Sequence, residues 1–207
     1  MPRLLHIKAS PRGLDSYSTQ LAEAFIQAFK QNHPLYGTDE LDVFHANLPA
    51  FEAPQAAAKY AVMSGQEPTG AAGRAWKAVI GVINDFKSAD MYLISSPMWN
   101  FSIPYRLKQY IDILVQPGLT FSYSAAGGYK GLVTGKKAFL MLARGGAYPP
   151  STKSDMQQPY LEMILRFVGV EEIRAVVASS TLMAGAAEVH DMMEVAKEQA
   201  RTIAAEA

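Results

Sequence analysis

A short apolar segment that stops at a proline is the strongest constraint on how this chain can fold. Residues 91–94 read Met-Tyr-Leu-Ile, a run too short for a buried helix and typical of a strand covered on both faces of a parallel sheet. Pro97 lacks the amide hydrogen that a sheet ladder needs, so the strand must end there. Ser102 is the expected N-cap of a following helix, with Pro104 in its first turn. Residues 95–104 are therefore predicted to be a loop at the carboxyl end of a buried strand.

Strand-like and helix-like segments alternate along the rest of the chain. Strands are expected at residues 4–8, 41–44, 91–94, 137–142 and 173–178, and helices around 19–29, 76–86, 104–114, 155–168 and 186–205. This alternation predicts an α/β protein with a parallel sheet and helices on both faces. Five such units fit the flavodoxin-like strand order 2-1-3-4-5. In the helix at 155–168, the side chains expected to face the core are Met156, Tyr160, Met163, Ile164 and Phe167.

The length of 207 residues predicts one domain, residues 1–207, with two excursions. The first, at about 46–68, is rich in proline and is expected to be a lid or a partner contact. The second, at about 116–137, is expected to be a hairpin that projects over the ligand edge of the sheet. Within it, Phe121 and Tyr123 would either add an aromatic wall to a ligand site or pack across the hairpin.

Charge and cysteine content exclude several classes of protein. Lysine plus arginine and aspartate plus glutamate both number 19, so neither nucleic acid nor an anionic membrane surface is an expected partner. The amino terminus lacks the apolar stretch of a secretory signal and no run is long enough to span a bilayer, which predicts a cytoplasmic location. With no cysteine, any redox chemistry needs a bound cofactor.

The loop after the first strand is rich in hydroxyl groups. Ser10, Ser16 and Ser18 lie between that strand and the amino terminus of a helix, where backbone N–H groups and the helix dipole favour an anion. The chain has neither the glycine pattern of a dinucleotide site nor a P-loop, so the serines suit a monophosphate held without lysine or metal. The same serines would also serve as plain helix caps, and the loop alone does not decide between these readings.

Two further loops follow buried strands. Met98, Trp99, Asn100 and Phe101 suit a flat apolar ligand that needs one or two directed hydrogen bonds, although they could equally pack under the loop or against another subunit. The Gly145-Gly146 pair after the strand at 137–142 allows a close approach of backbone to a ligand, or forms an ordinary tight turn.

Hydrolytic and phosphoacceptor chemistry have weaker support. The four histidines have no metal-ligand spacing and no evident serine partner, so each is expected to be structural or exposed: His6, His33, His45 and His190. The acidic pairs Asp39-Glu40 and Glu171-Glu172 resemble solvated charge. No acidic residue follows the first strand, as a phosphoacceptor domain would require. Since the three loops above are neighbours in the order 2-1-3-4-5, flavin mononucleotide (FMN) is the ligand that fits them best together.

Several runs carry a resemblance to a known family. They are Ser10 with Ser-Tyr-Ser at 16–18, Pro-Met-Trp-Asn-Phe at 97–101, Leu-Thr-Phe at 119–121, Gly-Leu-Val-Thr-Gly-Lys-Lys-Ala at 131–138 and Arg-Gly-Gly at 144–146. In this order, over nearly the whole chain, they resemble the FMN-dependent NADH azoreductases, also described as NADH:quinone oxidoreductases.

The resemblance implies roles for individual residues. Ser10, Ser16, Tyr17 and Ser18 would hold the FMN phosphate, Pro97, Met98, Trp99, Asn100 and Phe101 would line the isoalloxazine, and Ala143, Arg144, Gly145 and Gly146 would approach its pyrimidine edge. No metal and no catalytic side chain are implied, because the flavin carries the chemistry and Asn100 orients it. The chain departs from the usual pattern at Trp99, which replaces tyrosine, and at Ala9 and Ala143, which stand where serine is common.

The function implied is electron transfer from NADH or NADPH through FMN to a quinone or azo compound, in a ping-pong sequence. The resemblance also implies a homodimer with FMN at the subunit interface. One alternative is a flavodoxin-like electron carrier that turns over no small molecule, but the net charge of zero gives no acidic docking surface. A flavin-free module that uses the serine loop for another phosphate ligand is the second alternative.

Overall fold

The computed structural model describes residues 1–149 and 153–207. Its centre is a five-stranded parallel sheet in the order β2-β1-β3-β6-β7. The strands are β1 (Arg3–Lys8), β2 (Gly37–Asp42), β3 (Met91–Pro97), β6 (Lys137–Ala143) and β7 (Glu172–Ala178). Because β6 and β7 are the fourth and fifth strands of this sheet along the chain, the predicted order 2-1-3-4-5 is confirmed. A separate antiparallel pair, β4 (Phe121–Ser124) and β5 (Gly128–Gly131), stands outside it.

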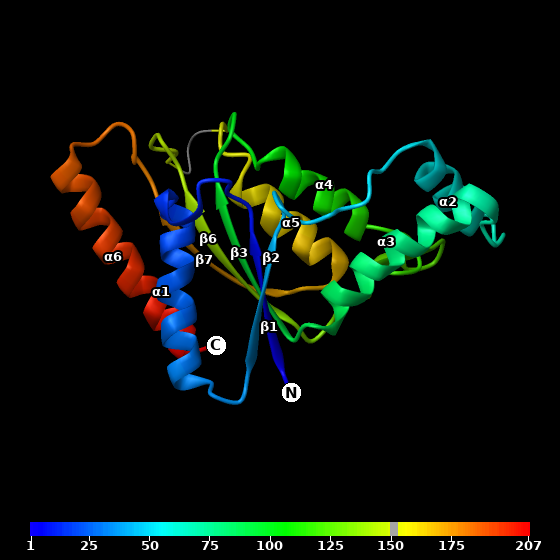
Figure 1. The fold of residues 1–207 in the computed structure, drawn as a ribbon, viewed down its shortest axis with the longest axis horizontal. Helices are drawn as coiled ribbons and strands as arrows, with labels where there is room; N and C mark the ends of the chain where they lie inside the picture. The colour runs from blue at the N-terminus through cyan, green and yellow to red at the C-terminus, as the bar shows by residue number, and fades with distance from the viewer. Residues whose placement is uncertain (150–152) are drawn as a thin grey trace.

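Helices cover both faces of the sheet, as Figure 1 shows. One face carries α1 (Tyr17–Asn32) and α6 (Ala186–Ala205), which pack on Leu4, Leu93 and Phe139. The other carries α3 (Gly70–Ser88), α4 (Tyr105–Leu114) and α5 (Gln158–Val168), which pack on Ile7, Ile94 and Leu140. Side chains of successive strand residues point to opposite faces, so the continuous apolar runs of the central strands pack against the helices on both faces.

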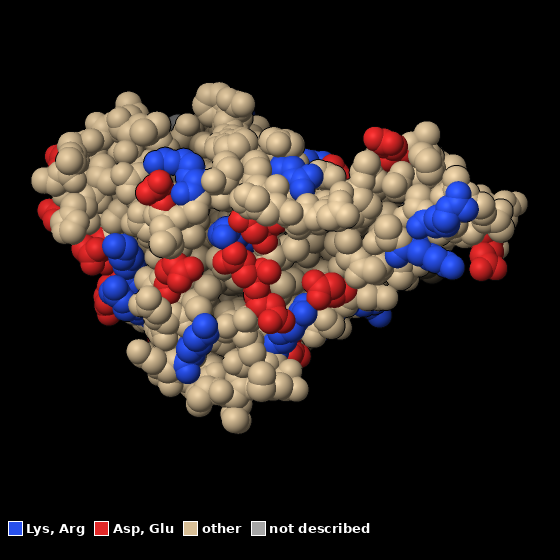
Figure 2. All heavy atoms as spheres, viewed as in Figure 1, with Lys and Arg blue, Asp and Glu red and all other residues tan. Residues whose placement is uncertain are grey.

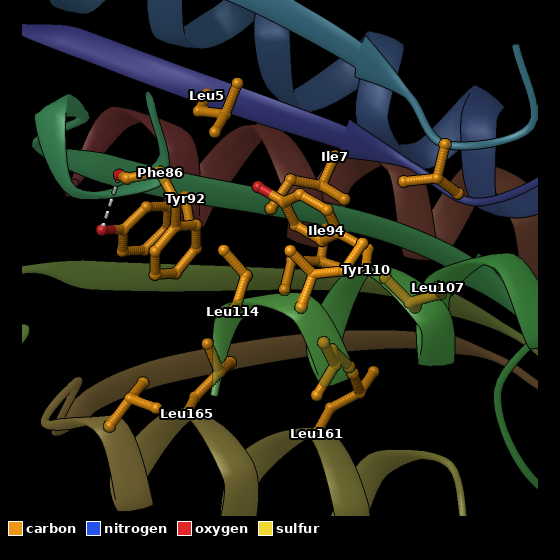
Figure 3. Close-up of a cluster of buried hydrophobic side chains, with 14 of the residues drawn as sticks. Leu5, Ile7, Phe86, Tyr92, Ile94, Leu107, Tyr110, Leu114, Leu161 and Leu165 are labelled. Carbon is orange, nitrogen blue, oxygen red and sulfur yellow. Dashed lines mark hydrogen bonds between the residues drawn. The ribbon is translucent and has the colours of Figure 1, made fainter. Parts of the chain in front are cut away.

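The core between the sheet and α3, α4 and α5 is built around aromatic side chains (Figure 3). Tyr92 stacks on Phe86 with ring centroids 4.1 Å apart, and its hydroxyl donates to the Phe86 carbonyl oxygen at 3.1 Å. Tyr110 meets Phe86 edge-on at 6.4 Å. These contacts fix the two helices that flank β3 in sequence, and thereby the loop that leaves its carboxyl end.

Several element boundaries differ from expectation. The second strand spans Gly37–Asp42 instead of 41–44, because its charged residues pair with β1 at the exposed edge of the sheet and do not need an apolar pattern. The first helix starts at Tyr17, with Ser16 as its N-cap. The helix after the central strand starts at Tyr105 with Pro104 at the N-cap, so Ser102 does not cap it.

The face of α5 that points inward was predicted incorrectly in part. Met156 precedes the helix and Met163 is 58% exposed, while the buried residues are Leu161, Leu165 and Val168. The segment has apolar residues on two adjoining faces, and only the register set by its start at Gln158 selects between them.

The excursion at 116–137 forms the expected hairpin but not at the expected edge. Gly131 packs so closely on Gly169 that a Cβ there would overlap the backbone of Val168 and Gly169. This contact places the hairpin beside the amino-terminal ends of β6 and β7, opposite the edge where the serine loop lies. Phe121 packs on Phe167 at 4.8 Å and Tyr123 on Tyr129 at 5.0 Å, so these aromatic residues pack around the hairpin and do not wall the ligand edge of their own sheet.

The excursion at 46–68 contains α2 (Ala53–Met63), which packs against α3. In Figure 1, α2 and the adjoining end of α3 project away from the sheet, while the other end of α3 lies against it. Among residues 1–149 and 153–207, no helix is both long enough and apolar enough to cross a membrane.

Candidate functional site

A hollow of about 250 Å³ opens at the carboxyl edge of the sheet, between the loops that follow β1, β3, β6 and β7. Nine of the thirteen residues predicted from the sequence line it: Ser10, Ser16, Tyr17, Pro97, Met98, Trp99, Ala143, Arg144 and Gly145. Segments that are more than 120 residues apart along the chain thus meet at one place. Ser18, Asn100, Phe101 and Gly146 do not line the hollow but adjoin residues that do.

The start of α1 faces the hollow without a side-chain cap. Ser16 holds the N-cap position, yet its hydroxyl makes no hydrogen bond to the first-turn amides and instead lies 3.1 Å from the Ser18 hydroxyl. Thr19 Oγ1, in the same turn, is buried and has no partner among the described residues. The first N–H groups of a helix have no acceptor within the helix and carry the positive end of its dipole. This helix end is therefore suited to an anionic ligand.

A tight turn carries Asn100 and Phe101 above the hollow. Trp99 and Ser102 exchange two backbone hydrogen bonds of 2.9 Å, and the residues between them have φ angles of 47° and 69°. Two central residues at positive φ define a type I′ turn, which favours asparagine and glycine and is strained at phenylalanine. Strain of this kind collects at functional sites.

Neighbouring loops hold this turn in place. The Met98 amide donates to the Ala143 carbonyl oxygen at 2.8 Å, and the Met156 amide donates to the Phe101 carbonyl oxygen at 2.9 Å. The Phe101 ring meets Tyr148 edge-on at 6.3 Å. The strained turn is thus held by bonds to the end of β6 and to the segment that leads into α5.

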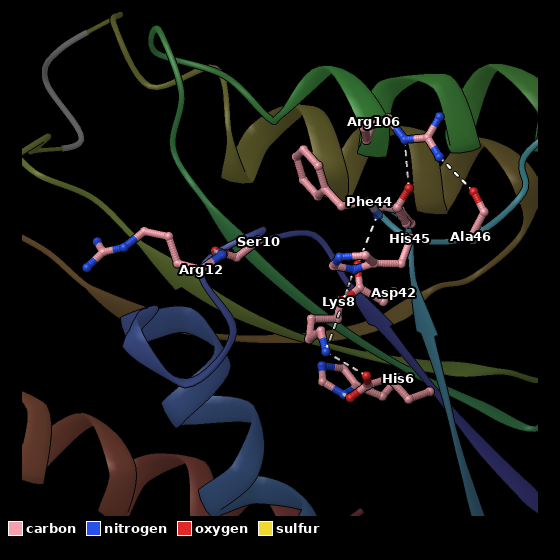
Figure 4. A network of polar contacts seen from close by, with 11 residues as sticks. His6, Lys8, Ser10, Arg12, Asp42, Phe44, His45, Ala46 and Arg106 are labelled. Carbon is pink, nitrogen blue, oxygen red and sulfur yellow. Dashed lines mark hydrogen bonds and ion pairs between the residues drawn. The ribbon is translucent and has the colours of Figure 1, made fainter.

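Trp99 packs on Phe44, with ring centroids 5.7 Å apart. Arg106 of α4 holds the loop that carries Phe44, donating from Nε to the Val43 carbonyl oxygen and from Nη2 to the Ala46 carbonyl oxygen, both at 2.7 Å (Figure 4). The aromatic wall beside Trp99 therefore rests on a fixed backbone.

The Arg144 side chain turns away from the hollow and is buried. Its Nη2 lies 2.8 Å from Asp155 Oδ2, and its Nε donates to Gln157 Oε1 at 3.2 Å. Gln157 in turn donates from Nε2 to the Ser96 carbonyl oxygen at 3.0 Å. What Arg144 presents to a ligand is thus mainly its backbone, while its guanidinium joins the start of α5 to β3.

Two residues after β7, Thr181 and Leu182, complete the hollow, and no local sequence pattern predicts them there. Thr181 and Leu182 donate their amides to the carbonyl oxygens of Arg144 and Gly145, each at 3.1 Å. A Cβ at Gly145 would lie 2.8 Å from Leu182 Cδ1, so glycine permits this close approach. Pro11 and Arg12 also line the hollow and were missed, although both belong to the serine loop. The loop is predicted to hold a phosphate through its serine hydroxyl groups, and that prediction does not include Arg12.

A polar cluster lies behind the hollow, on β1 and β2 (Figure 4). His6 does have a serine partner, because its Nε2 lies 2.9 Å from Ser95 Oγ. Both residues are buried and neither lines the hollow, so the contact is structural.

The Glu40 carboxylate is not simply solvated, because it is paired with His6 and Lys8. The contact from the His6 ring and then the Lys8 ammonium, 2.6 Å away, lower the pKa of Glu40 to about 2, although partial burial works in the opposite direction. No cluster of three or more metal-ligating side chains occurs among the described residues.

The strand order and the helices on both faces make the fold flavodoxin-like, and the hollow lies at the carboxyl ends of β1, β3 and β6, the edge at which such sheets generally bind ligands. The family model for the flavodoxin-like fold matches residues 2–204.

Individual relatives identify the family more narrowly than the match to the flavodoxin-like fold does. An FMN-dependent NADH:quinone oxidoreductase of Nitratidesulfovibrio vulgaris (strain DP4) is 48% identical over 209 residues, covering 100% of both chains. FMN-dependent NADH:quinone oxidoreductase 9 of Burkholderia lata is 36% identical and covers 99% of both chains. The chain belongs to the family of FMN-dependent NADH:quinone oxidoreductases.

Solved structures agree with this assignment. The crystal structure of an azoreductase from Bacillus anthracis str. Sterne superposes with a TM-score of 0.91 at 28% identity, over 100% of both chains. An FMN-dependent NADH-azoreductase from Bacillus anthracis str. Ames Ancestor, in complex with FMN, gives a TM-score of 0.86 at 25% identity and covers 99% of this chain and 100% of its own.

Proposed function

We propose that this protein is an FMN-dependent oxidoreductase that passes electrons from NADH or NADPH to quinones or azo compounds. The observation that carries the proposal is the single hollow in which an uncapped helix start, an aromatic loop and a close-approaching backbone meet. The names of the relatives and of the similar structures support the same activity.

The serine loop would hold the FMN phosphate. Ser10 and Ser16 line the hollow, and the Ser18 hydroxyl, 3.1 Å from the Ser16 hydroxyl, would orient it by a hydrogen bond. The free amides of the α1 first turn, including that of Tyr17, would donate to the phosphate oxygens. The buried, unpartnered Thr19 hydroxyl in the same turn is consistent with a polar ligand at this end of the helix.

The other two loops would hold the isoalloxazine. Pro97, Met98 and Trp99 offer one wall, and the turn at Asn100 and Phe101 would orient the ring with its amide groups. On the far side the backbone of residues 143–146 would face the pyrimidine edge, with Ala143 offering no hydroxyl group. Bound FMN supplies hydride and electron transfer, so the protein binds and orients it and keeps the site apolar.

We further propose a ping-pong sequence, in which the nicotinamide donor leaves before the acceptor enters, because one hollow serves both. The working unit would be a homodimer with FMN at the interface, and each chain would be one domain. Exposed apolar side chains around the hollow and on α2 support an interface there, among them Phe101, Tyr105, Tyr60 and Met63.

The visible absorption spectrum of the purified protein tests the proposal, followed by anaerobic addition of NADH and identification of the chromophore released on denaturation. We expect a flavin spectrum, release of FMN and bleaching by NADH, then reoxidation by a quinone. Protein that neither contains nor takes up FMN would contradict the proposal, and FMN that NADH cannot reduce would indicate an electron carrier.

A further inference from the structure

We propose that Arg12 binds a phosphate group at the mouth of the hollow, an inference that rests on the proposed function. Its side chain is exposed and lines the hollow beside Ser10 and Ser16. Its amide donates to Ser10 Oγ at 3.4 Å, which ties the loop backbone to the serine that faces the ligand. In Figure 4 the guanidinium points away from the polar cluster on β1 and β2.

Arg12 has no competing ion pair among the residues that the structure describes. Within residues 1–149 and 153–207, no carboxylate lies within 4.0 Å of its guanidinium, including that of Asp15 in the same loop. On the face shown in Figure 2, acidic and basic side chains are interspersed, so that face carries no broad positive patch.

The other cations near the hollow are already engaged. Lys8 is paired with Glu40 at 2.6 Å and with Asp42 at 3.1 Å. Arg106 donates to backbone carbonyl groups, and the guanidinium of Arg144 is held by Asp155. Of the four, Arg12 therefore is the cation still available to a ligand.

A phosphate group is the ligand chemistry that matches this arrangement. The hydroxyl groups and helix amides beside Arg12 are neutral donors, so a phosphate bound by them alone would keep most of its negative charge. A guanidinium donates two parallel hydrogen bonds to phosphate oxygens and balances that charge. Two molecules of the proposed reaction carry such a group: FMN has a monophosphate and the nicotinamide donor has a pyrophosphate.

The test compares Arg12→Gln, which removes the charge, and Arg12→Lys, which keeps it, with the unsubstituted protein. Lys30→Gln is the matched control, because Lys30 is exposed in the last turn of α1, roughly 20 Å from its first turn at 1.5 Å per residue. The dissociation constants of FMN and of riboflavin are measured by quenching of flavin fluorescence on titration with the flavin-free protein. The KM for NADH is measured on enzyme saturated with FMN.

A charge-assisted hydrogen bond at a partly exposed site corresponds to about a tenfold change in affinity. If Arg12 holds the flavin phosphate, Arg12→Gln weakens FMN about tenfold, leaves riboflavin unchanged and is partly rescued by Arg12→Lys. If it holds the donor pyrophosphate, FMN affinity stays unchanged and the KM for NADH rises by about the same factor. Equal constants in all variants would overturn the inference.

Two further outcomes also have a defined meaning: a variant that does not fold, and a variant that behaves like the unsubstituted protein. If Arg12→Gln does not fold, the unsubstituted protein is titrated in rising salt, which should weaken FMN or NADH but not riboflavin, and equal salt dependence of all three would overturn the inference. If the unsubstituted protein binds FMN and is reduced by NADH while Arg12→Gln behaves identically, the proposed function stands and the role of Arg12 is wrong. If the unsubstituted protein binds no flavin, the proposed function and the proposed role of Arg12 are both wrong.

Discussion

Trp99 and Ser102 exchange two backbone hydrogen bonds of 2.9 Å, and this pairing forces Asn100 and Phe101 into left-handed backbone conformations. Asparagine tolerates such a conformation and phenylalanine does not favour it. A substitution at Asn100 can therefore distinguish the effect of the turn's backbone conformation from the effect of the side chain on ligand binding.

Asn100→Gly makes this distinction, because glycine keeps the left-handed backbone conformation and removes only the side-chain amide. We expect the free energy of unfolding to change by less than about 1 kcal/mol. Reduction of bound FMN by NADH should slow by about tenfold if the amide orients the flavin. Anaerobic stopped-flow absorption measures this rate, and a rate equal to that of the unsubstituted protein would show that the Asn100 side chain does not orient the flavin.

Gly131→Ala should destabilise the fold, because the new methyl group would overlap the backbone of Val168 and Gly169. Overpacking against backbone costs about 1–3 kcal/mol, measured by urea unfolding. Gly81→Ala is the control, since Gly81 lies within α3 and its added Cβ meets nothing within 4 Å. That substitution should stabilise the protein by about 0.5–1 kcal/mol, and a Gly131→Ala protein of equal stability would disprove the close packing.

Arg144→Met should cost about 3 kcal/mol of stability, because it leaves the Asp155 carboxylate, which is 15% exposed, without its partner. Adding Asp155→Asn removes that uncompensated charge and should recover a part of the loss. A double-mutant cycle by urea unfolding measures the coupling. Strictly additive effects would mean that the two side chains do not interact.

The Glu40 carboxylate should make stability depend on pH in the acid range. Its pKa is about 2 in the folded chain against an ordinary value of 4.5, owing first to the His6 contact and then to Lys8. A lowered folded pKa means that the stabilisation is complete above pH 4.5 and is lost as the pH falls toward 2. Glu40 is 46% exposed, so screening by water limits the contribution to about 1 kcal/mol.

Glu40→Gln should therefore lower stability at pH 7 and flatten its decline between pH 4.5 and 2. Glu67→Gln, at an exposed residue of the α2–α3 loop, is the control and should leave the curve unchanged. Urea unfolding across this range gives the comparison, and parallel curves for Glu40→Gln and the unsubstituted protein would exclude the effect.

The central strands could be predicted because burial on two faces demands an unbroken apolar run, as at residues 91–94. The edge strand β2 could not be located as well, since its Glu40 and Asp42 are selected by pairing with Lys8 and not by burial. The direction of the β4–β5 hairpin depends on the contact of Gly131 with Gly169, which lie far apart in sequence. No local pattern contains that information.

The site shows the same division. Ser10, Pro97 and Gly145 could be predicted to lie together because each stands at the end of a recognisable strand, and parallel strands bring such residues to one edge. Leu182 comes to the hollow through a backbone bond to Gly145, and the guanidinium of Arg144 leaves it to reach Asp155. Both depend on tertiary contacts that spacing does not encode.

The uncapped start of α1 has a consequence for the life of the protein in a cell. A ligand that accepts the free first-turn amides supplies hydrogen bonds that the empty chain must leave to water. A ligand present at 100 times its dissociation constant stabilises the folded state by about 2.7 kcal/mol. Chains without a bound ligand should unfold more often and meet proteases more often, so we expect the amount of protein in a cell to rise with the supply of its ligand.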